Sequence, residues 1–123
     1  KAQALADRLT AATAVVALAD EGAICEAVQQ ATVVINATSL GMQVQSLVSP
    51  LPQSAQLRPE QVVLDMVYAP LTTTFLRQAK LAGVSTCLNG LSLLVAQGAA
   101  SFELWTGQSM PVAPVTAHLA TLL

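Results

Sequence analysis

Charged residues are scarce in this sequence. They make up 10% of the 123 residues, and lysine and arginine together number only 5, scattered along the chain. Nucleic-acid binding needs a basic face or stripe, which so few dispersed cations do not form. The sequence therefore predicts no nucleic-acid partner.

Cysteine and histidine are equally sparse. Cys25 and Cys87 are the only cysteines, and they lie far apart in sequence. Two isolated cysteines form neither a disulfide framework nor a metal motif, so we expect two reduced thiols in a cytoplasmic protein and no metal site. The single histidine, His118, lies in an apolar helical pattern near the C-terminus, where we expect it to be solvated or to cap the helix.

No apolar run is long enough to cross a membrane, although hydrophobic residues make up 54% of the chain. The most apolar window, 88–100, is shorter than the roughly 20 residues that a bilayer span needs, and it contains Ser92 and Gln97. We therefore expect no membrane partner and no secretory leader. The chain starts without methionine and within a helical pattern, so we expect it to be the C-terminal portion of a longer protein.

Short apolar strands alternate with helices along the rest of the chain. The pattern predicts strands at 14–18, 32–37, 61–67 and 84–88, and helices at 2–9, 20–30, 72–82, 90–107 and from Pro114 to the C-terminus. Residues 43–60 hold three prolines and predict a loop with one helical turn at 53–57. Such alternation is typical of an α/β fold, here half of a Rossmann-like parallel sheet.

The predicted carboxyl ends of the strands are polar or rich in glycine. They fall at 36–38, 66–68 and 89–90. Ligands of parallel α/β sheets bind at this edge, so we expect a binding site there.

The helix at 90–107 adds a second indication of that site. Gly90 and Gln97 lie about two turns apart on one line of the helix, roughly 10 Å along its axis. An apolar stripe runs beside them through Leu91, Leu94, Val95, Gly98, Phe102 and Trp105. A bare backbone and an amide that both donates and accepts suit a polyhydroxy ligand. A core helix with an incidental glutamine accounts for the same spacing.

Three segments resemble motifs of the shikimate dehydrogenase family. VINATSLGM at 34–42 is similar to its NATS-x-GM segment, and LDMVYAP at 64–70 to its DMVY-x-P segment. Residues 90–107 are similar to its GLGMLV-x-QA…F-x-LW-x-G helix. The resemblance implies that residues 1–107 are the C-terminal part of an NADP-binding Rossmann domain. It implies that 108–123 form a helix returning toward a substrate domain that lies outside this chain.

The resemblance also implies roles for six residues. Lys1 would face the 2′-phosphate of NADP, while Thr38, Met66 and Gly90 would border the cofactor. Tyr68 and Gln97 would bind the substrate. The family's catalytic lysine and aspartate fall outside this chain, which therefore has no catalytic residue of its own. We interpret Asp65, a carboxylate in an apolar strand, as a buried, hydrogen-bonded structural residue.

The implied function is the NADP-dependent reversible reduction of 3-dehydroshikimate to shikimate in aromatic amino acid biosynthesis. We expect the isolated chain to be inactive. A quinate/shikimate paralogue and a non-catalytic nucleotide-binding module are alternatives. Retention of both Tyr68 and Gln97 favours the enzyme. Asn89, Ser92 and Leu93 depart from the family pattern, which has aspartate, glycine and methionine there.

Overall fold

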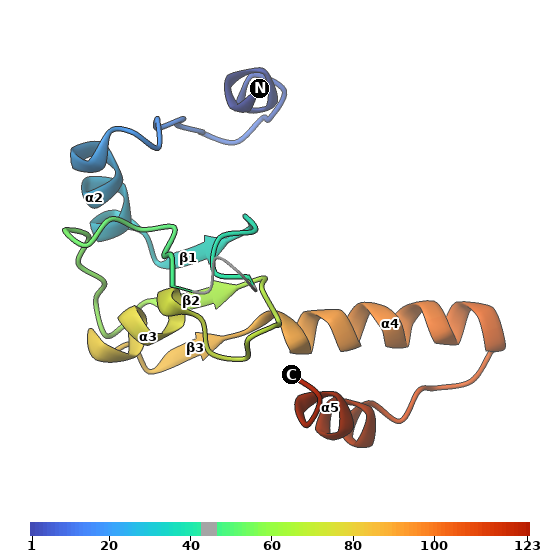
Figure 1. The fold of residues 1–123 in the computed structure, drawn as a ribbon. Helices are drawn as coiled ribbons and strands as arrows, with labels where there is room; N and C mark the ends of the chain where they lie inside the picture. The colour runs from blue at the N-terminus through green and yellow to red at the C-terminus, as the bar shows by residue number, and fades with distance from the viewer. Residues whose placement is uncertain (43–46) are drawn as a thin grey trace.

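The computed structural model describes residues 1–42 and 47–123. Within them, five helices and three strands follow one another along the chain (Figure 1). In order they are α1 (Ala2–Ala6), α2 (Glu21–Gln30), β1 (Val33–Asn36), β2 (Val62–Asp65), α3 (Thr74–Leu81), β3 (Thr86–Leu88), α4 (Gly90–Thr106) and α5 (Val112–Ala120).

The three strands form one parallel sheet in the order β1-β2-β3. Val34, Val63 and Cys87 lie side by side across the strands, and Ile35, Leu64 and Leu88 form the next row. Because all three strands run the same way, their carboxyl ends meet at one edge of the sheet, next to the start of α4 (Figure 1). The predicted α/β class and parallel sheet are therefore confirmed.

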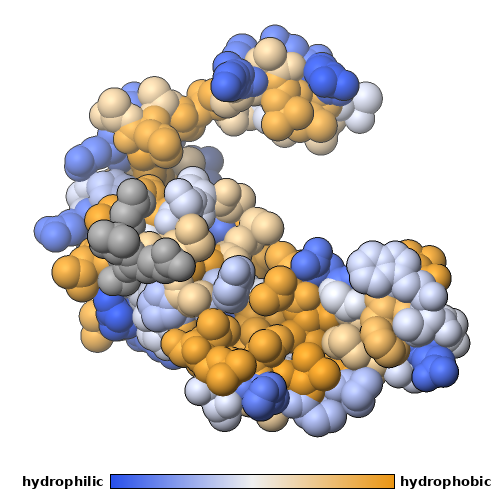
Figure 2. Space-filling model, turned by 45° about the vertical axis from the view of Figure 1, so that its right-hand side comes forward, coloured by the Kyte–Doolittle hydropathy of each residue, from blue (hydrophilic) through white to orange (hydrophobic). Residues whose placement is uncertain are grey.

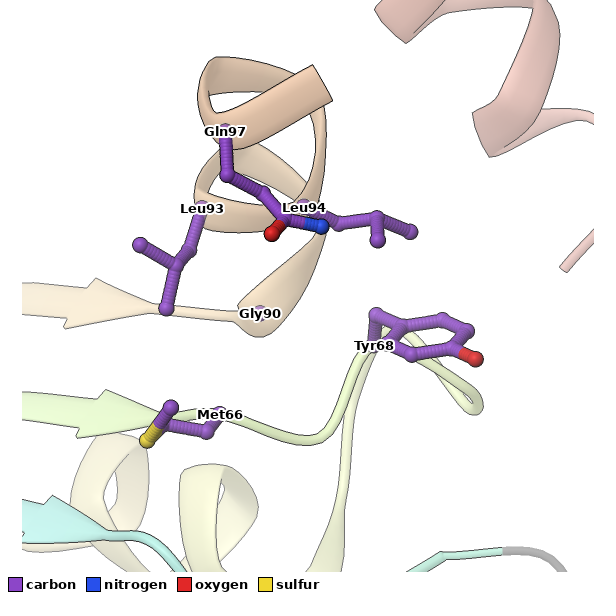
Figure 3. Close-up of a pocket in the computed structure, with 6 residues that line it drawn as sticks. All are labelled: Met66, Tyr68, Gly90, Leu93, Leu94 and Gln97. Atoms are coloured by element: carbon purple, nitrogen blue, oxygen red, sulfur yellow. The ribbon is translucent and has the colours of Figure 1, made fainter. Parts of the chain in front are cut away.

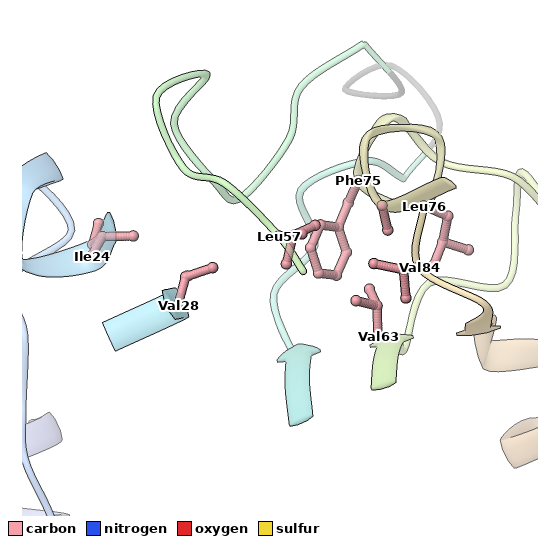
Figure 4. Packing of buried hydrophobic residues seen from close by; sticks show 8 residues of the cluster. Ile24, Val28, Leu57, Val63, Phe75, Leu76 and Val84 are labelled. Atoms are coloured by element: carbon pink, nitrogen blue, oxygen red, sulfur yellow. The ribbon is translucent and has the colours of Figure 1, made fainter. Parts of the chain in front are cut away.

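The hydrophobic core lies on one face of this sheet. Side chains from α2, α3 and the loop before β2 surround Val63 there (Figure 4). The buried cluster consists of Ile24, Val28, Leu57, Val63, Phe75, Leu76, Ala79 and Val84. The row on the opposite face is less covered within the described residues, since Ile35 and Leu88 are both about half exposed. The core is therefore one-sided in the described part of the chain.

Two side chains near the start of β2 fasten the end of α2 to the sheet. The buried Gln61 amide donates 2.7 Å hydrogen bonds to the carbonyls of Val28 and Ala31. Its oxygen accepts a 2.7 Å bond from the Arg58 backbone N–H. The Arg58 guanidinium in turn donates to the carbonyls of Gln29 and Ala31. These bonds satisfy carbonyls that a helix C-terminus leaves without partners.

The predicted strand at 14–18 is wrong. This segment has no regular secondary structure, and its apolar side chains are exposed, Leu18 among them. A strand needs a neighbour that completes its backbone hydrogen bonds, and no described strand pairs with this segment. Two smaller expectations are also corrected. Residues 53–54 form a turn and 55–57 have no regular secondary structure, so the expected helical turn is absent there. The last helix begins directly after Pro111, with Pro114 inside its first turn.

Helix α4 extends beyond the sheet, and α5 packs back against it (Figure 1). Figure 2 shows α1 standing apart at the top and apolar side chains gathered over the lower part of the molecule. Leu91 and Val95 of the predicted apolar stripe are buried, whereas Trp105 is 83% exposed. The stripe is therefore a core face only near the start of α4. None of the described helices combines the length and the apolar character that a bilayer span requires.

Both cysteines are free thiols in partly buried positions. Burial raises the pKa of the Cys87 thiol, an effect that the Lys80 ammonium partly offsets. Because the thiolate is the reactive form, Cys87 stays a neutral, slow nucleophile to higher pH than an ordinary cysteine. We expect iodoacetamide to label Cys25 before Cys87 at mildly alkaline pH, as followed by mass spectrometry of the peptides. Faster labelling of Cys87 would contradict this assignment.

Candidate functional site

A cavity of about 320 Å³ opens at the carboxyl edge of the sheet, between the end of β2 and the first two turns of α4 (Figure 3). Its lining consists of Met66, Tyr68, Gly90, Leu93, Leu94 and Gln97. Four of the six residues that the sequence singled out thus come together, from two separate motifs. Their meeting at this edge agrees with the expected location of the site.

The segment 66–68 supplies one wall of the cavity. Met66 and Tyr68 are 44% and 40% exposed, while Val67 between them is 4% exposed and points into the protein. Both polar backbone groups of Val67 are engaged. Its N–H donates to Asp65 Oδ1 at 3.0 Å, and its carbonyl accepts from the Gly90 N–H at 3.0 Å. The alternation places the thioether and the phenol on the cavity side (Figure 3).

Asp65 lies fully buried beneath this wall. Its Oδ1 accepts a second hydrogen bond, from Asn36 Nδ2 at 2.9 Å, and its Oδ2 accepts from Thr73 Oγ1 at 2.5 Å. The same Thr73 hydroxyl accepts from the Leu76 N–H and so caps α3. The interpretation of Asp65 as a buried, hydrogen-bonded residue is confirmed. Its carboxylate joins the ends of β1 and β2 to the start of α3.

Gly90 is required by close packing against β2. A Cβ built on it would lie 2.0 Å from the Met66 carbonyl oxygen and 2.5 Å from the Met66 carbonyl carbon. The direction of an added Cβ is therefore filled by the backbone that follows β2. The assignment of Gly90 to the cofactor site stays a prediction. Among the described glycines, a positive φ occurs at Gly41, Gly83 and Gly107, so the backbone conformation of Gly90 does not itself require glycine.

Asn89 holds the start of α4 against the segment that follows β2. Its side-chain oxygen accepts from the Leu91 N–H at 3.1 Å, and its Nδ2 donates to the Leu71 carbonyl at 3.2 Å. That segment contains a cis peptide bond between Ala69 and Pro70. An ionised aspartate has no donor for the Leu71 carbonyl. The departure from the family's aspartate therefore adds a hydrogen bond between two elements of the site.

Helix α4 supplies the opposite wall. Leu93, Leu94 and Gln97 extend from it toward the wall formed by Met66 and Tyr68 (Figure 3). Sequence reasoning placed Leu94 only in the core stripe, although it lies four residues after Gly90 and three before Gln97. This spacing puts Gly90, Leu94 and Gln97 on one side of the helix, and it is the sequence signal that identifies Leu94 as a lining residue.

Few polar groups face the cavity. The Gln97 amide and the Tyr68 hydroxyl are the polar side-chain groups among the six lining residues, and Tyr68 is the one titratable side chain of the set. The arrangement suits a ligand that combines a flat, apolar-faced ring with hydroxyl groups. It offers an amide and a phenol for orientation, but no carboxylate, imidazole or amine for proton transfer near neutral pH.

Lys1 and Thr38 do not line the cavity. Lys1 is exposed at the start of α1, which stands apart from the sheet (Figure 1). The Thr38 hydroxyl donates to Asn36 Oδ1 at 2.7 Å and accepts from the Leu40 N–H at 3.2 Å. It thereby shapes the turn after β1, at the same edge as the cavity. Their assignments as cofactor-binding residues stay predictions.

Comparison with protein families places part of the chain in a known family model. A family model described as the C-terminal domain of shikimate 5′-dehydrogenase matches residues 90–119. Among curated proteins, the shikimate dehydrogenase (NADP(+)) of Streptococcus sanguinis is 41% identical over 97 residues, which cover 79% of this chain and 33% of the relative. The chain spans about a third of the length of the curated relatives it matches.

Solved structures show the same similarity in three dimensions. Shikimate 5-dehydrogenase from Listeria monocytogenes, in complex with shikimate and NAD, matches with a TM-score of 0.83 and 31% identity, over 95% of this chain and 40% of that one. The enzyme from Thermus thermophilus, in complex with NADP(H) and shikimate, matches with a TM-score of 0.72 and 35% identity, over 80% of this chain and 37% of that one.

Proposed function

Because this chain belongs to the shikimate dehydrogenase family, we propose that it forms the nicotinamide- and substrate-holding part of an NADP-dependent enzyme that reversibly reduces 3-dehydroshikimate to shikimate. One observation carries the proposal. Met66 and Tyr68 of one motif and Gly90 and Gln97 of another line a single cavity at the carboxyl edge of the parallel sheet. An incidental core glutamine would not meet a tyrosine and a methionine there.

The apolar walls fit the ring of the cofactor. Met66 is exposed to the cavity, and its polarizable thioether suits the face of a flat ring. Leu93 extends the apolar surface from α4. When bound, the nicotinamide supplies or accepts the hydride. The chain's own residues hold the ring against the wall and keep water from one of its faces.

The polar groups of the cavity fit the substrate. The Gln97 amide both donates and accepts, so it matches a pair of neighbouring hydroxyls, and the Tyr68 hydroxyl adds a further polar contact. A module that binds only the nucleotide has no use for two such groups beside the ring. Their position favours the enzyme over the non-catalytic alternative.

Proton transfer falls to groups outside this lining. Oxidation of an alcohol releases the hydroxyl proton, and the six lining residues include no carboxylate, imidazole or amine to accept it. We propose that the family's lysine and aspartate provide this step. The 123-residue chain is then a binding part of the enzyme and does not turn over shikimate by itself.

The direct test is calorimetric titration of the chain with NADP and with shikimate. The proposal expects both ligands to bind, and shikimate to bind more tightly once NADP is present. Binding of NADP without shikimate would favour the nucleotide-binding module. If neither NADP nor shikimate binds, the proposed function is wrong.

Gln97→Ala is expected to weaken shikimate binding about tenfold while leaving NADP affinity nearly unchanged. The lost amide makes one or two hydrogen bonds to a neutral ligand, each contributing roughly 0.5–1.5 kcal/mol. The same titrations provide the measurement. Gln30→Ala is the matched control, because it removes an exposed helical glutamine on α2, away from the cavity. Equal weakening of both ligands would mean that Gln97 acts on the fold.

A further inference from the structure

We infer that Asp65 is a positioning residue that sets the orientation of Met66 and Tyr68 in the cavity by holding the Val67 backbone N–H. The inference rests on the proposed function for the choice of ligands. Its structural part concerns only where the Tyr68 ring lies.

The contact path is short. Asp65 is buried and does not line the cavity, but its Oδ1 accepts from the Val67 N–H at 3.0 Å. Val67 lies between the two cavity residues, so its peptide orientation decides which way their side chains point. The Gly90 N–H fixes the Val67 carbonyl at 3.0 Å. Two residues therefore hold the Val67 backbone: Asp65 binds its N–H, and Gly90 binds its carbonyl.

The remaining contacts hold the carboxylate itself in place. Asn36 donates to Oδ1 from the end of β1, and Thr73 donates to Oδ2 from the start of α3. The Asn36 side chain also donates to the Leu40 carbonyl at 3.0 Å and accepts from Thr38, so it is fixed as well. A carboxylate held from two elements presents its oxygen to Val67 in one position.

The hydrogen-bond pattern distinguishes two substitutions. Alanine removes every acceptor and frees the Val67 N–H. Asparagine has one orientation that keeps the bonds from Asn36 and Val67, with its oxygen toward both. Its amide then donates to the Thr73 hydroxyl, whose own proton loses the acceptor that the carboxylate provides. Asp65→Asn therefore keeps the bond to Val67, and Asp65→Ala loses it.

Gln61 provides a control for a purely structural effect. It is another buried polar residue beside β2, and its amide makes two hydrogen bonds to α2 carbonyls at the opposite end of the strand. Gln61→Ala is expected to destabilise the protein without changing the cavity wall. If Asp65 acted on stability alone, the two alanine variants would affect ligand binding in the same way.

Tyr68 reports on the geometry directly. It is the chain's single tyrosine, so ring-labelled tyrosine gives one set of NMR signals that needs no ligand. In the full 123-residue chain, Asp65→Ala should shift these signals and weaken shikimate binding about tenfold, whereas Asp65→Asn and Gln61→Ala should match the parent in both. Melting curves recorded alongside report the stability of each variant.

Unmoved Tyr68 signals in Asp65→Ala, or an equal movement in Gln61→Ala, would overturn the inference. If Asp65→Ala does not fold, Asp65→Asn provides the test. We expect its Tyr68 ring signals and the exchange protection of its Val67 amide to match the parent. Loss of the Val67 protection with unmoved Tyr68 signals would overturn the inference. If the parent binds neither ligand, the proposed function fails, while the ring signals still judge the role of Asp65.

Discussion

Gly90→Ala is expected to destabilise this chain by about 1–3 kcal/mol, and Gly90→Val by more, because a Cβ at this position meets backbone. The clash partner is the Met66 carbonyl, 2.0 Å from the added carbon, so no side chain can rotate away to relieve it. Relief requires that α4 and the end of β2 move apart, which also breaks the Gly90–Val67 hydrogen bond. Thermal or denaturant unfolding measures the loss.

Gly98→Ala is the matched control on the same helix. A Cβ at Gly98 meets no atom within 4 Å, and alanine is the better helix former. We expect this variant to gain about 0.5–1 kcal/mol. Similar changes in both variants would contradict the close-packing account of Gly90.

Phe75→Ala is expected to cost about 3–5 kcal/mol in the free energy of unfolding. Phe75 is 1% exposed and lies in the centre of the one-sided core, between α3 and Val63 of β2 (Figure 4). Truncation leaves a cavity that the surrounding helices and sheet fill only in part. A loss of this size is a large share of the roughly 5–15 kcal/mol that typically separates folded from unfolded protein.

Phe102→Ala compares the same change of side chain at the chain's other phenylalanine. Phe102 is 36% exposed on α4, outside the core cluster. We expect its truncation to cost about 1 kcal/mol, as measured in the same denaturant series. Equal losses at the two positions would show that the core extends along α4 as far as the sequence pattern suggested.

The sheet could be predicted because its strands carry their own signal. β1 and β2 fall within apolar, β-branched runs, and the helices that precede β1 and separate β2 from β3 favour a parallel arrangement. The segment 14–18 carries a similar run and forms no strand. Local preference describes how well a segment fits a sheet, but the neighbour that completes its hydrogen bonds is decided by the rest of the fold.

The sequence predicted which residues line the cavity better than it predicted why each residue is needed there; their binding roles stay predictions. Family resemblance placed Met66, Tyr68, Gly90 and Gln97 together, and the cavity contains all four. The need for glycine at position 90 depends on the distance to the Met66 carbonyl, which no sequence pattern reports.

The double anchoring of Val67 has a thermodynamic consequence. Its N–H and carbonyl are both engaged before any ligand arrives, so the backbone of this wall has little conformational freedom left to lose. Association costs entropy wherever loops and side chains must be ordered. For a ligand of the proposed site, the Val67 backbone would therefore add little to that cost, and ordering would fall mainly on the side chains of the cavity surface.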